Sequence, residues 1–417
     1  MKEFIIEGGH LLSGEIKISG AKNAALALIP AALLSNKKVK IYNVPNISDI
    51  ENIKEILRHL NVKMKETKEY LEIDASKLIN APVPEEISKK LRASYYFMSA
   101  LLGKYKKVEM YFPGGCSIGA RPIDQTLKAF EALGAKVIEE NNKYTITAEE
   151  LIGTDISLDM PSVGATVNAM LVSTKAKGIT KIYNAAKEPE IVSVATFLNN
   201  MGAKIKGAGT STITIEGVNN LSGAFTEVIP DRIEAGTYII AGALLGNNLK
   251  ITNIIPKHVE SLTEKLKEMG VPLTIKEDSI IVSKANNLKP VKVKTLGYPG
   301  FPTDLQQPLT TLLTQVNGTS TLEETIYENR FKNVEYLNKM GANIEIIGQK
   351  IKIKGPTKLT GTNVEATDLR AGACMVLAAL IADNTTTINS IEHVLRGYEN
   401  IIEKLSNVGA KIELIDN

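Results

Sequence analysis

Met201-Gly202-Ala203-Lys204-Ile205 is one of six copies of a short phrase whose regular recurrence decides the fold. The second residue of each copy stands at position 61, 134, 202, 270, 341 or 409, so the copies follow one another every 68 to 73 residues. So constant a spacing indicates an internal repeat. The six copies are Leu60–Met64, Leu133–Val137, Met201–Ile205, Met269–Leu273, Met340–Ile344 and Val408–Ile412.

Each copy is expected to end one helix and begin one strand. Apolar residues precede it at helical spacing, as in Val194, Phe197 and Met201, and this spacing predicts an amphipathic helix. Gly at the second position suits the positive φ of a helix C-cap. An alternating strand follows each of the first five copies but not the sixth. Because Glu15–Gly20 resembles Lys350–Gly355, we expect the N-terminal strand to complete the last repeat.

Every repeat also contains a second helix that is apolar on nearly all sides, which predicts a buried helix. Six units of strand, buried helix, strand, surface helix and hairpin exceed one core. We therefore expect an α/β protein with two domains of three βαβαββ repeats each, formed by residues 1–21 with 230–417 and by residues 22–229. The buried helices are expected at Ala24–Leu34, Ala93–Leu102, Thr166–Thr174, Ala235–Leu245, Leu309–Val316 and Ala371–Ala382.

Composition excludes several classes of protein. The 417 residues include 49 Lys and Arg against 46 Asp and Glu, a net charge of +3. This balance gives no overall field for nucleic acid or for an anionic membrane. The longest apolar runs are shorter than the ~20 residues that a membrane span needs. Early charges at the N-terminus and two cysteines, too few for a disulfide framework, favour the reducing cytoplasm. Four histidines without metal-ligand spacing predict no metal, and no organic cofactor is implied.

Polar residues gather just ahead of the buried helices. Helix N-termini present free N–H groups and suit phosphates, and nearby basic side chains strengthen that preference. Two readings stay open: the basic residues can be ordinary surface charges, and the aspartates can be simple helix caps. The residues concerned are Lys22, Arg92, Ser162–Gly164, Asp231, Asp304, Asp368 and Arg370.

The longest loop, Pro113–Asp124, holds three glycines around Cys116. Such a loop exposes its backbone, unlike the surroundings of a buried structural thiol. Cys116 is therefore a candidate for chemistry, although most lone cysteines are unreactive. Cys374 lies in an apolar run and is expected in the core.

Several of these segments, taken together, resemble the UDP-N-acetylglucosamine 1-carboxyvinyltransferases, a family of enolpyruvyl transferases. The resemblance runs over essentially the whole chain, and the Cys116 loop is its most specific part. The segments are Gly20–Asn23, Arg92–Ser94, Pro113–Pro122, Ser162–Thr166, Asn184–Glu190, Asp368–Arg370 and Arg396–Glu399.

The resemblance implies a fold and a reaction. The fold is a pair of inside-out α/β barrels, with the active site in the cleft between the two domains. The reaction passes enolpyruvyl from phosphoenolpyruvate to the 3′-hydroxyl of UDP-N-acetylglucosamine by addition and elimination, releasing phosphate. This is the first committed step of peptidoglycan precursor synthesis, in the cytoplasm, and its thiol is the target of fosfomycin. The sequence leaves the oligomeric state open.

The resemblance also assigns residues. Cys116 matches the acid that protonates the vinyl carbon, and Asp304 matches the proposed base for the sugar hydroxyl. The residues matching the phosphoenolpyruvate site are Lys22, Asn23, Arg121, Arg370 and Arg396. Those matching the nucleotide-sugar site are Asn23, Arg92, Arg121, Pro122, Ile123, Asp124, Gln125, Ser162, Val163, Gly164, Asp304, Ile326 and Arg330. The chain departs from many relatives at Met160-Pro161, where a basic residue is common, and at Gln125-Thr126.

Three rival functions remain. A 5-enolpyruvylshikimate-3-phosphate synthase would share the fold and the donor, but that sister family does not use a cysteine. RNA 3′-phosphate cyclisation uses related repeats, but it needs a histidine nucleophile that this chain does not match. A repeat scaffold without catalysis would have neither a reactive thiol nor a ligand in a cleft.

Overall fold

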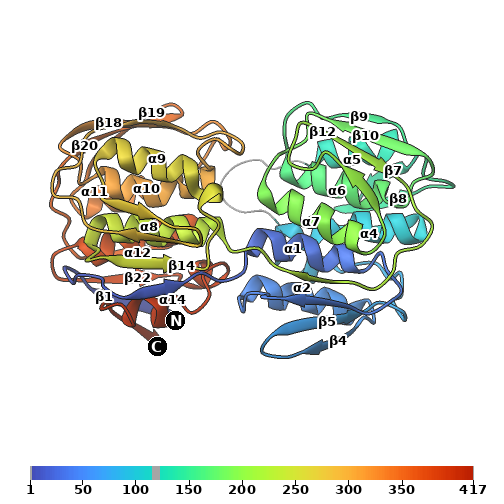
Figure 1. The fold of residues 1–417 in the computed structure, drawn as a ribbon, viewed down its shortest axis with the longest axis horizontal. Coiled ribbons are helices and arrows are strands. Elements are labelled where there is room, and N and C mark those ends of the chain that lie inside the picture. Colours follow the sequence, from blue (N-terminus) through green and yellow to red (C-terminus); the bar gives the residue numbers. More distant parts are fainter. Residues whose placement is uncertain (1, 115–122, 417) are drawn as a thin grey trace. The chain divides into compact units, whose positions relative to one another are not determined.

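The computed structural model describes residues 2–114 and 123–416, which form two compact units (Figure 1). Unit 1 contains residues 2–19 and 230–416, and unit 2 contains residues 20–114 and 123–229. Each unit has its own hydrophobic core. Cys374, expected in the core, is buried in unit 1.

Unit 2 packs buried helices against three sheets (Figure 1). Its buried helices are α1 (Lys22–Ala32), α4 (Tyr96–Tyr105) and α6 (Val163–Ser173), and its amphipathic helices are α2 (Ser48–His59), α5 (Asp124–Ala132) and α7 (Pro189–Asn200). Two short helices, α3 (Glu85–Ser88) and η1 (Arg92–Tyr95), precede α4. The strands are β3 (Val39–Tyr42), β4 (Lys63–Glu66), β5 (Tyr70–Asp74), β6 (Lys107–Tyr111), β7 (Lys136–Glu140), β8 (Lys143–Thr147), β9 (Asp155–Ser157), β10 (Ile179–Tyr183), β11 (Lys204–Lys206), β12 (Thr212–Glu216) and β13 (Phe225–Glu227).

Unit 1 is built in the same way. Its buried helices α8 (Arg232–Leu245), α10 (Gln306–Leu313) and α12 (Leu369–Ile381) contact one another. The remaining helices are η2 (Pro256–Val259), α9 (Glu260–Met269), η3 (Thr303–Leu305), α11 (Asn333–Lys339), α13 (Glu392–Leu395) and α14 (Ile401–Ser406). The strands are β1 (Lys2–Glu7), β2 (Glu15–Lys17), β14 (Leu249–Thr252), β15 (Leu273–Ile275), β16 (Ser279–Val282), β17 (Lys292–Lys294), β18 (Gly318–Glu323), β19 (Asn343–Ile347), β20 (Lys350–Gly355), β21 (Asn363–Glu365), β22 (Thr385–Asn389) and β23 (Lys411–Asp416).

Five of the six described sheets share one strand order: a short parallel edge strand, its neighbour, and then two further antiparallel strands. In β6-β8-β7, the sixth sheet, an isolated parallel bridge from Val83 to Met110 occupies the edge position. The described strands form these separate open sheets, and none closes on itself. The barrel expected from the resemblance is therefore not present as a closed sheet.

The N-terminal segment differs from the expectation. The strand that joins the last sheet is β1, which pairs with both β22 and β23. Glu15–Lys17, the segment that resembles Lys350–Gly355, instead forms β2 and pairs in parallel with β14. The likeness is local, whereas pairing is decided by which apolar residues find a core: Phe4 and Ile6 of β1 are fully buried.

The helix ends follow the repeated phrase. The second residues of all six copies have φ between 57° and 110°, the left-handed conformation expected of a C-cap. They are Asn61, Gly134, Gly202, Gly270, Gly341 and Gly409.

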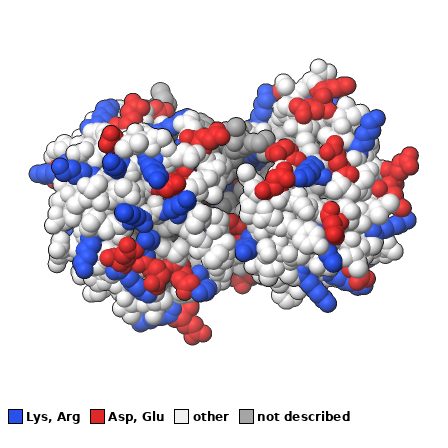
Figure 2. Space-filling model, turned by 90° about the horizontal axis from the view of Figure 1, so that it is seen from above, with Lys and Arg blue, Asp and Glu red and all other residues white. Residues whose placement is uncertain are grey.

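The described surface carries both signs of charge intermixed on the face drawn in Figure 2. Within residues 2–114 and 123–416, no helix has the length and apolar character needed to cross a membrane.

Candidate active site

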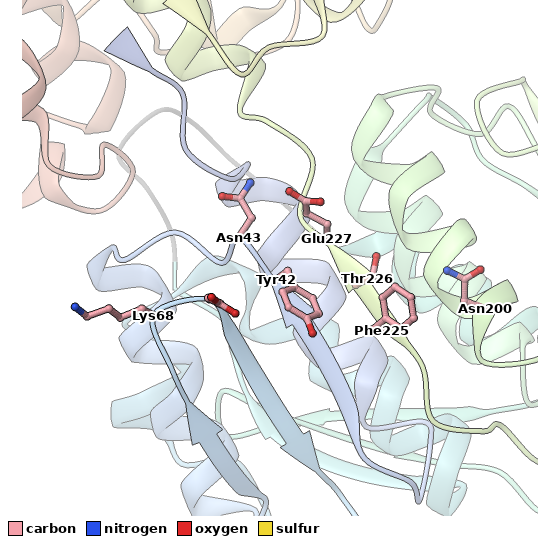
Figure 3. Close-up of a pocket in the computed structure, with 8 residues that line it drawn as sticks. Tyr42, Asn43, Lys68, Asn200, Phe225, Thr226 and Glu227 are labelled. Atoms are coloured by element: carbon pink, nitrogen blue, oxygen red, sulfur yellow. The ribbon is translucent and has the colours of Figure 1, made fainter. Parts of the chain in front are cut away.

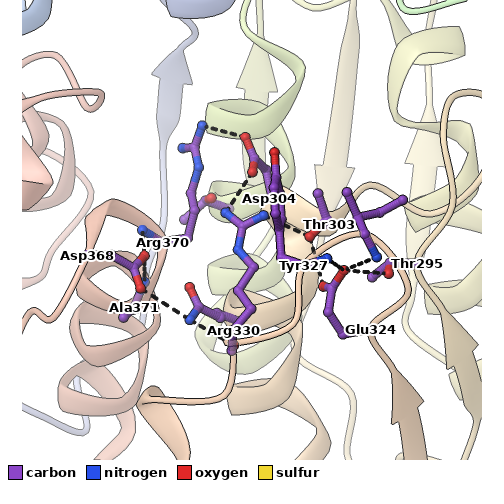
Figure 4. Close-up of polar contacts among 12 residues, drawn as sticks. Thr295, Thr303, Asp304, Glu324, Tyr327, Arg330, Asp368, Arg370 and Ala371 are labelled. Carbon is purple, nitrogen blue, oxygen red and sulfur yellow. Dashed lines mark hydrogen bonds and ion pairs between the residues drawn. The ribbon is translucent and has the colours of Figure 1, made fainter. Parts of the chain in front are cut away.

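The most prominent polar cluster of unit 1 surrounds Asp304 in η3, just before α10 (Figure 4). Its Oδ1 accepts from Arg330 Nη2 at 2.7 Å, and its Oδ2 accepts from Arg370 Nη2 at 3.1 Å. Both arginine side chains are 4% exposed, whereas the Asp304 side chain is 26% exposed. One carboxylate thus holds two buried guanidinium groups and still reaches solvent.

The charges in this cluster reinforce one another. Desolvation of the Asp304 carboxyl favours its neutral form, but the charges of Arg370 and Arg330 outweigh it and hold its pKa well below the usual range. Desolvation lowers the pKa of Arg370 and Arg330, but the Asp304 charge together with nearby tyrosine and aspartate groups outweighs it and raises the pKa of both guanidinium groups. Asp304 is therefore ionised at neutral pH.

The aspartates ahead of the buried helices have different roles. Asp231 caps α8 by accepting from the N–H groups of Ile233 and Glu234. Asp368 caps α12 in the same way, accepting from Arg370 and Ala371. For these two residues the capping interpretation is confirmed. Asp304 makes no cap, because α10 begins without a side-chain cap bond.

Arg370 is oriented from a second side by Tyr398. Its Nη1 donates to the Tyr398 hydroxyl at 3.2 Å, and its guanidinium carbon lies 5.5 Å from the centre of the tyrosine ring. The same hydroxyl lies 2.9 Å from Thr237 Oγ1 on α8. Tyr398 is buried, and its bond with Arg370 links the segment that follows Arg396 to the Asp304 cluster.

Another carboxylate of unit 1, Glu234 on α8, is buried. Its Oε1 accepts from Lys404 Nζ at 2.5 Å, and its Oε2 accepts from the Ser19 N–H at 2.8 Å. The Ser19 hydroxyl also bonds with Lys404 and Glu399. Burial raises the pKa of Glu234 to about 7, because the single cation Lys404 only partly offsets desolvation.

In unit 2, Lys22 opens α1 and faces a carboxylate of α2. Its Nζ lies 2.7 Å from Asp49 Oδ2, and both side chains are buried. Its neighbour Asn23 is exposed. The sequence singled out Lys22 but not Asp49, because the two residues meet only when α1 packs against α2.

Arg92 and Gly164 meet through a tyrosine. The Arg92 guanidinium lies 5.5 Å from the centre of the Tyr95 ring, which stacks on Tyr96. A Cβ at Gly164 would lie 1.4 Å from the Tyr95 hydroxyl oxygen, so any side chain there would displace the Tyr95 ring. The N-terminus of α6 is capped by Ser162, whose hydroxyl accepts from the Ala165 N–H.

Gln125 ties the start of α5 to the segment before α6. Its Nε2 donates to Asp159 Oδ2 at 2.8 Å, and its Oε1 accepts from the Asp159 N–H at 2.8 Å. Lys128 Nζ lies 2.7 Å from Asp159 Oδ1. Ile123 is buried and Asp124 is exposed beside Gln125. These contacts fix the stretch that leads into Ser162.

The remaining predicted residues have different fates. Cys116, Arg121 and Pro122 lie outside the described residues. Arg396 is partly buried at the end of α13, and Ile326 is exposed after β18. The Cys374 sulfur accepts from Asn333 Nδ2 and lies 3.2 Å from Thr311 Oγ1, and burial raises the pKa of its thiol to about 11. Such a thiol is inert.

A hollow of about 670 Å³ in unit 2 lies apart from these residues (Figure 3). Tyr42 and Phe225 supply its aromatic side, and Lys68, Glu69 and Glu227 its charges. None of the predicted site residues lines it. Across the described ranges, no three His, Cys, Asp or Glu side chains gather in a way that could hold a metal ion.

Comparison with known proteins identifies the family. Residues 6–405 match the family described as EPSP synthase (3-phosphoshikimate 1-carboxyvinyltransferase). UDP-N-acetylglucosamine 1-carboxyvinyltransferase 2 of Listeria monocytogenes is 52% identical over 408 residues, covering 98% of this chain and 96% of that protein. The Bacillus subtilis protein of the same name is 52% identical over 413 residues, covering 99% and 96%. This chain belongs to the UDP-N-acetylglucosamine 1-carboxyvinyltransferase family.

Solved structures agree with this family. The enolpyruvyl transferase NikO from Streptomyces tendae has a TM-score of 0.91 at 27% identity, covering 99% of each chain. EPSP synthase from Acinetobacter baumannii, with a TM-score of 0.77 at 19% identity and full coverage of both chains, shares the fold. As a member of the UDP-N-acetylglucosamine 1-carboxyvinyltransferase family, the chain is a transferase with the enolpyruvyl transferase fold.

Some residues that build the candidate site of this UDP-N-acetylglucosamine 1-carboxyvinyltransferase family member were not found from the sequence. They are buried and include Asp49, which contacts Lys22, Tyr398, which contacts Arg370, and Thr237, which contacts Tyr398. Tyr398 lies in the Arg396–Glu399 segment that carries the resemblance, but no role was predicted for it, and Asp49 lies inside an amphipathic helix without a sequence signal of its own. Only packing identifies them.

Proposed function

We propose that this chain transfers the enolpyruvyl group of phosphoenolpyruvate to the 3′-hydroxyl of UDP-N-acetylglucosamine and releases phosphate. The identity to proteins of that name supports the reaction. The observation within the chain that carries it is the ionised Asp304 between two buried arginines. That cluster combines a proton acceptor with cations suited to a substrate that carries both a phosphate and a carboxylate.

The addition step needs an acid and a base. We assign the acid to Cys116, whose thiol proton goes to the vinyl carbon, and the base to Asp304, which takes the proton of the sugar hydroxyl. The hydroxyl oxygen bonds to the central carbon of phosphoenolpyruvate to give a tetrahedral phospho-ketal. Loss of phosphate and of a methyl proton then restores the double bond in the product.

Asp304 needs more basicity than its present partners allow, since a carboxylate held by two guanidinium groups accepts a proton poorly. Of the two partners, Arg330 also bonds Thr303, whereas Arg370 matches the phosphoenolpyruvate site. We propose that Arg370 leaves Asp304 for the substrate anion. Binding of phosphoenolpyruvate would thereby raise the pKa of the base that the next step requires.

The nucleotide sugar is assigned to residues of both units. The Ser162-capped start of α6 presents N–H groups suited to a diphosphate, with Arg92 beside it through Tyr95. The resemblance places Asn23, Arg121–Gln125, Asp304 and Ile326 at the same ligand. Arg330 was assigned there too, but its contacts with Asp304 and Thr303 favour a supporting role.

The proposed reaction also implies a repeat architecture and a position for the active site. We interpret the shared strand order as six βαβαββ repeats, three in each unit, and place the active site in a cleft between the units. Lys22, Asn23, Arg121, Arg370 and Arg396 would hold phosphoenolpyruvate there. The predicted role is the first committed step of peptidoglycan synthesis, and the cytoplasmic location stays a prediction.

Phosphate release tests the reaction. The protein is incubated with phosphoenolpyruvate and either UDP-N-acetylglucosamine or shikimate 3-phosphate. We expect phosphate only with the nucleotide sugar. Release only with shikimate 3-phosphate would instead assign the sister reaction, whose name the family match also carries.

A pair of cysteine variants tests the acid. We expect Cys116→Ala to abolish turnover and labelling by fosfomycin, because it removes the thiol that donates the proton. Cys374→Ala is the matched control and should keep both, since that thiol is buried within unit 1. Full turnover in Cys116→Ala would remove Cys116 from the chemistry.

A further inference from the structure

The buried carboxylate of Glu324, which is linked to Asp304 through Thr303 and Arg330, was not singled out by the sequence. Glu324 follows β18 and is fully buried. Its Oε1 accepts from Thr295 Oγ1 at 2.9 Å and from the N–H groups of Ile326 and Tyr327 at 2.8 and 3.2 Å. Its Oε2 accepts from Thr303 Oγ1 at 2.8 Å (Figure 4). Two hydroxyl groups and two backbone N–H groups therefore converge on one side chain.

The contact with Thr303 leads directly to Asp304. The Thr303 hydroxyl donates to Glu324 and accepts from Arg330 Nη1 at 2.7 Å. Arg330 Nη2 in turn donates to Asp304 at 2.7 Å. Glu324 therefore sets the direction of the Thr303 hydroxyl, and with it the lone pair that receives Arg330.

A second route reaches the same arginine. Arg330 lies 5.1 Å from the centre of the Tyr327 ring, and the Tyr327 N–H is bound by Glu324. The buried Arg330 Nε has no partner among the described residues, so Thr303, Asp304 and the Tyr327 ring fix its guanidinium. Glu324 orients two of these three contacts.

The chemistry of the side chain matters here, because a carboxylate only accepts hydrogen bonds. Glutamine has the same shape but would place an NH2 group against Thr303 or against the two backbone N–H groups. In the first case the Thr303 hydroxyl, which already accepts from Arg330, loses its acceptor. In the second case Ile326 and Tyr327 face another donor.

We propose that Glu324 is a positioning residue of the reaction. It fixes Thr303 and Arg330 so that Asp304 points at the sugar hydroxyl, and it holds the Ile326 segment at the nucleotide sugar. This inference rests on the proposed function of Asp304. No charged side chain bonds to Glu324 among the described contacts, so its role is to align donors rather than to neutralise a cation.

The chain offers a matched control in the preceding residue. Glu323 pairs with Lys294 and Lys350 at 3.5 and 3.3 Å, and its side chain is 29% exposed. We expect Glu324→Gln to lower kcat/KM about 100-fold and to raise the KM for UDP-N-acetylglucosamine, because small misplacements of catalytic groups have effects of that size. Glu323→Gln should stay within about twofold of the parent, since exposed ion pairs contribute little.

A second set of variants separates positioning from folding. Thr303→Val keeps the shape but removes the hydroxyl relay, so kcat should fall about 10-fold while the KM for UDP-N-acetylglucosamine stays unchanged, because the Ile326 bond remains. Thr303→Ser restores the hydroxyl and should restore kcat. Thr263→Val on α9 controls for loss of a buried hydroxyl, because among the described residues the Thr263 hydroxyl bonds only the Glu260 carbonyl of the same helix.

Asp304→Asn, assayed in parallel, distinguishes failure of the inference about Glu324 from failure of the proposed role of Asp304. If Asp304→Asn is impaired while Thr303→Val and a folded Glu324→Gln have parental kcat, the inference about Glu324 is wrong and the role of Asp304 stands. If Asp304→Asn turns over like the parent, the proposed base is wrong and Glu324 loses its role with it. Loss of kcat in Thr303→Val with recovery in Thr303→Ser supports the inference even if Glu324→Gln does not fold.

Discussion

Asp304 and Glu234 are two carboxylates of the same unit with opposite proton affinities. Asp304 is partly exposed and shared by two guanidinium groups, so its pKa falls well below the usual range. Glu234 is fully buried with one ammonium group, and its pKa rises to about 7. The number of cations that contact a carboxylate, more than its burial alone, therefore decides whether it stays charged.

The number of cations per carboxylate also distinguishes a cluster that can bind substrate from one that only stabilises the fold. Arg370 can leave Asp304 for a substrate anion while Arg330 still compensates the carboxylate. Lys404 has no such freedom, because its departure would leave Glu234 without a cation among its described partners. The Asp304 cluster, with two arginines on one carboxylate, can therefore bind an anionic ligand. The one-to-one pair of Glu234 and Lys404 instead has a structural role.

The largest expected effect comes from removing the exchangeable cation. Arg370→Met should lower kcat/KM for phosphoenolpyruvate about 1,000-fold, an effect of the size seen when one member of a buried charge pair is removed. Steady-state kinetics with each substrate varied in turn measures it. An unchanged KM and kcat would show that Arg370 holds no substrate anion. Lys358→Met, which removes one partner of an exposed pair with Asp383, is the control.

Neutralising the shared carboxylate should come next. Asp304→Asn leaves two buried guanidinium groups without a counter-charge, so we expect it to lower the free energy of unfolding by about 3–5 kcal/mol at pH 7. Because the folded pKa is depressed, this stabilisation is present above the unfolded pKa near 3.9 and is lost as pH falls through the folded value. Urea unfolding at pH 7 and pH 3 checks it, and an equal difference at both would contradict it.

The smallest effect concerns Glu234. Its raised pKa means that its stabilisation is complete below the unfolded pKa near 4.5 and is lost as pH rises through about 7. The parent should therefore lose about 3 kcal/mol more than Glu234→Gln between these values. Thermal or urea unfolding of both proteins from pH 4.5 to 8 measures the slope. Parallel curves would place the raised pKa elsewhere.

Periodicity predicted most of the local structure. The repeated phrase located six helix ends, and the apolar runs located the buried helices, because both signals depend on neighbours in sequence. Strand pairing was different. Glu15–Gly20 looked like the missing strand, but the distant Phe4 and Ile6 supplied the apolar side chains that the last sheet needed. Non-local pairing leaves little trace in a local pattern.

The sequence predicted the charged residues of the candidate site but not the residues that hold them in place. Asp304 and Arg370 stood out because they precede buried helices, and they meet. Glu324 did not, because Glu323-Glu324 reads as an ordinary pair of surface charges. Strand alternation alone turns one of them inward, and the donors that make this acceptable come from Thr295 and Thr303.

The pairing of β1 between β22 and β23 has a consequence for how the protein is made. The described residues of unit 2, 20–114 and 123–229, lie between the two parts of unit 1 in the chain and can complete their core before β22 and β23 are made. Strand β1 precedes these residues in the chain, but the strands it pairs with, β22 and β23, follow them. Until β22 and β23 have been made, the alternating apolar face of β1 lacks its partner strands, so we expect unit 1 to complete its core after unit 2.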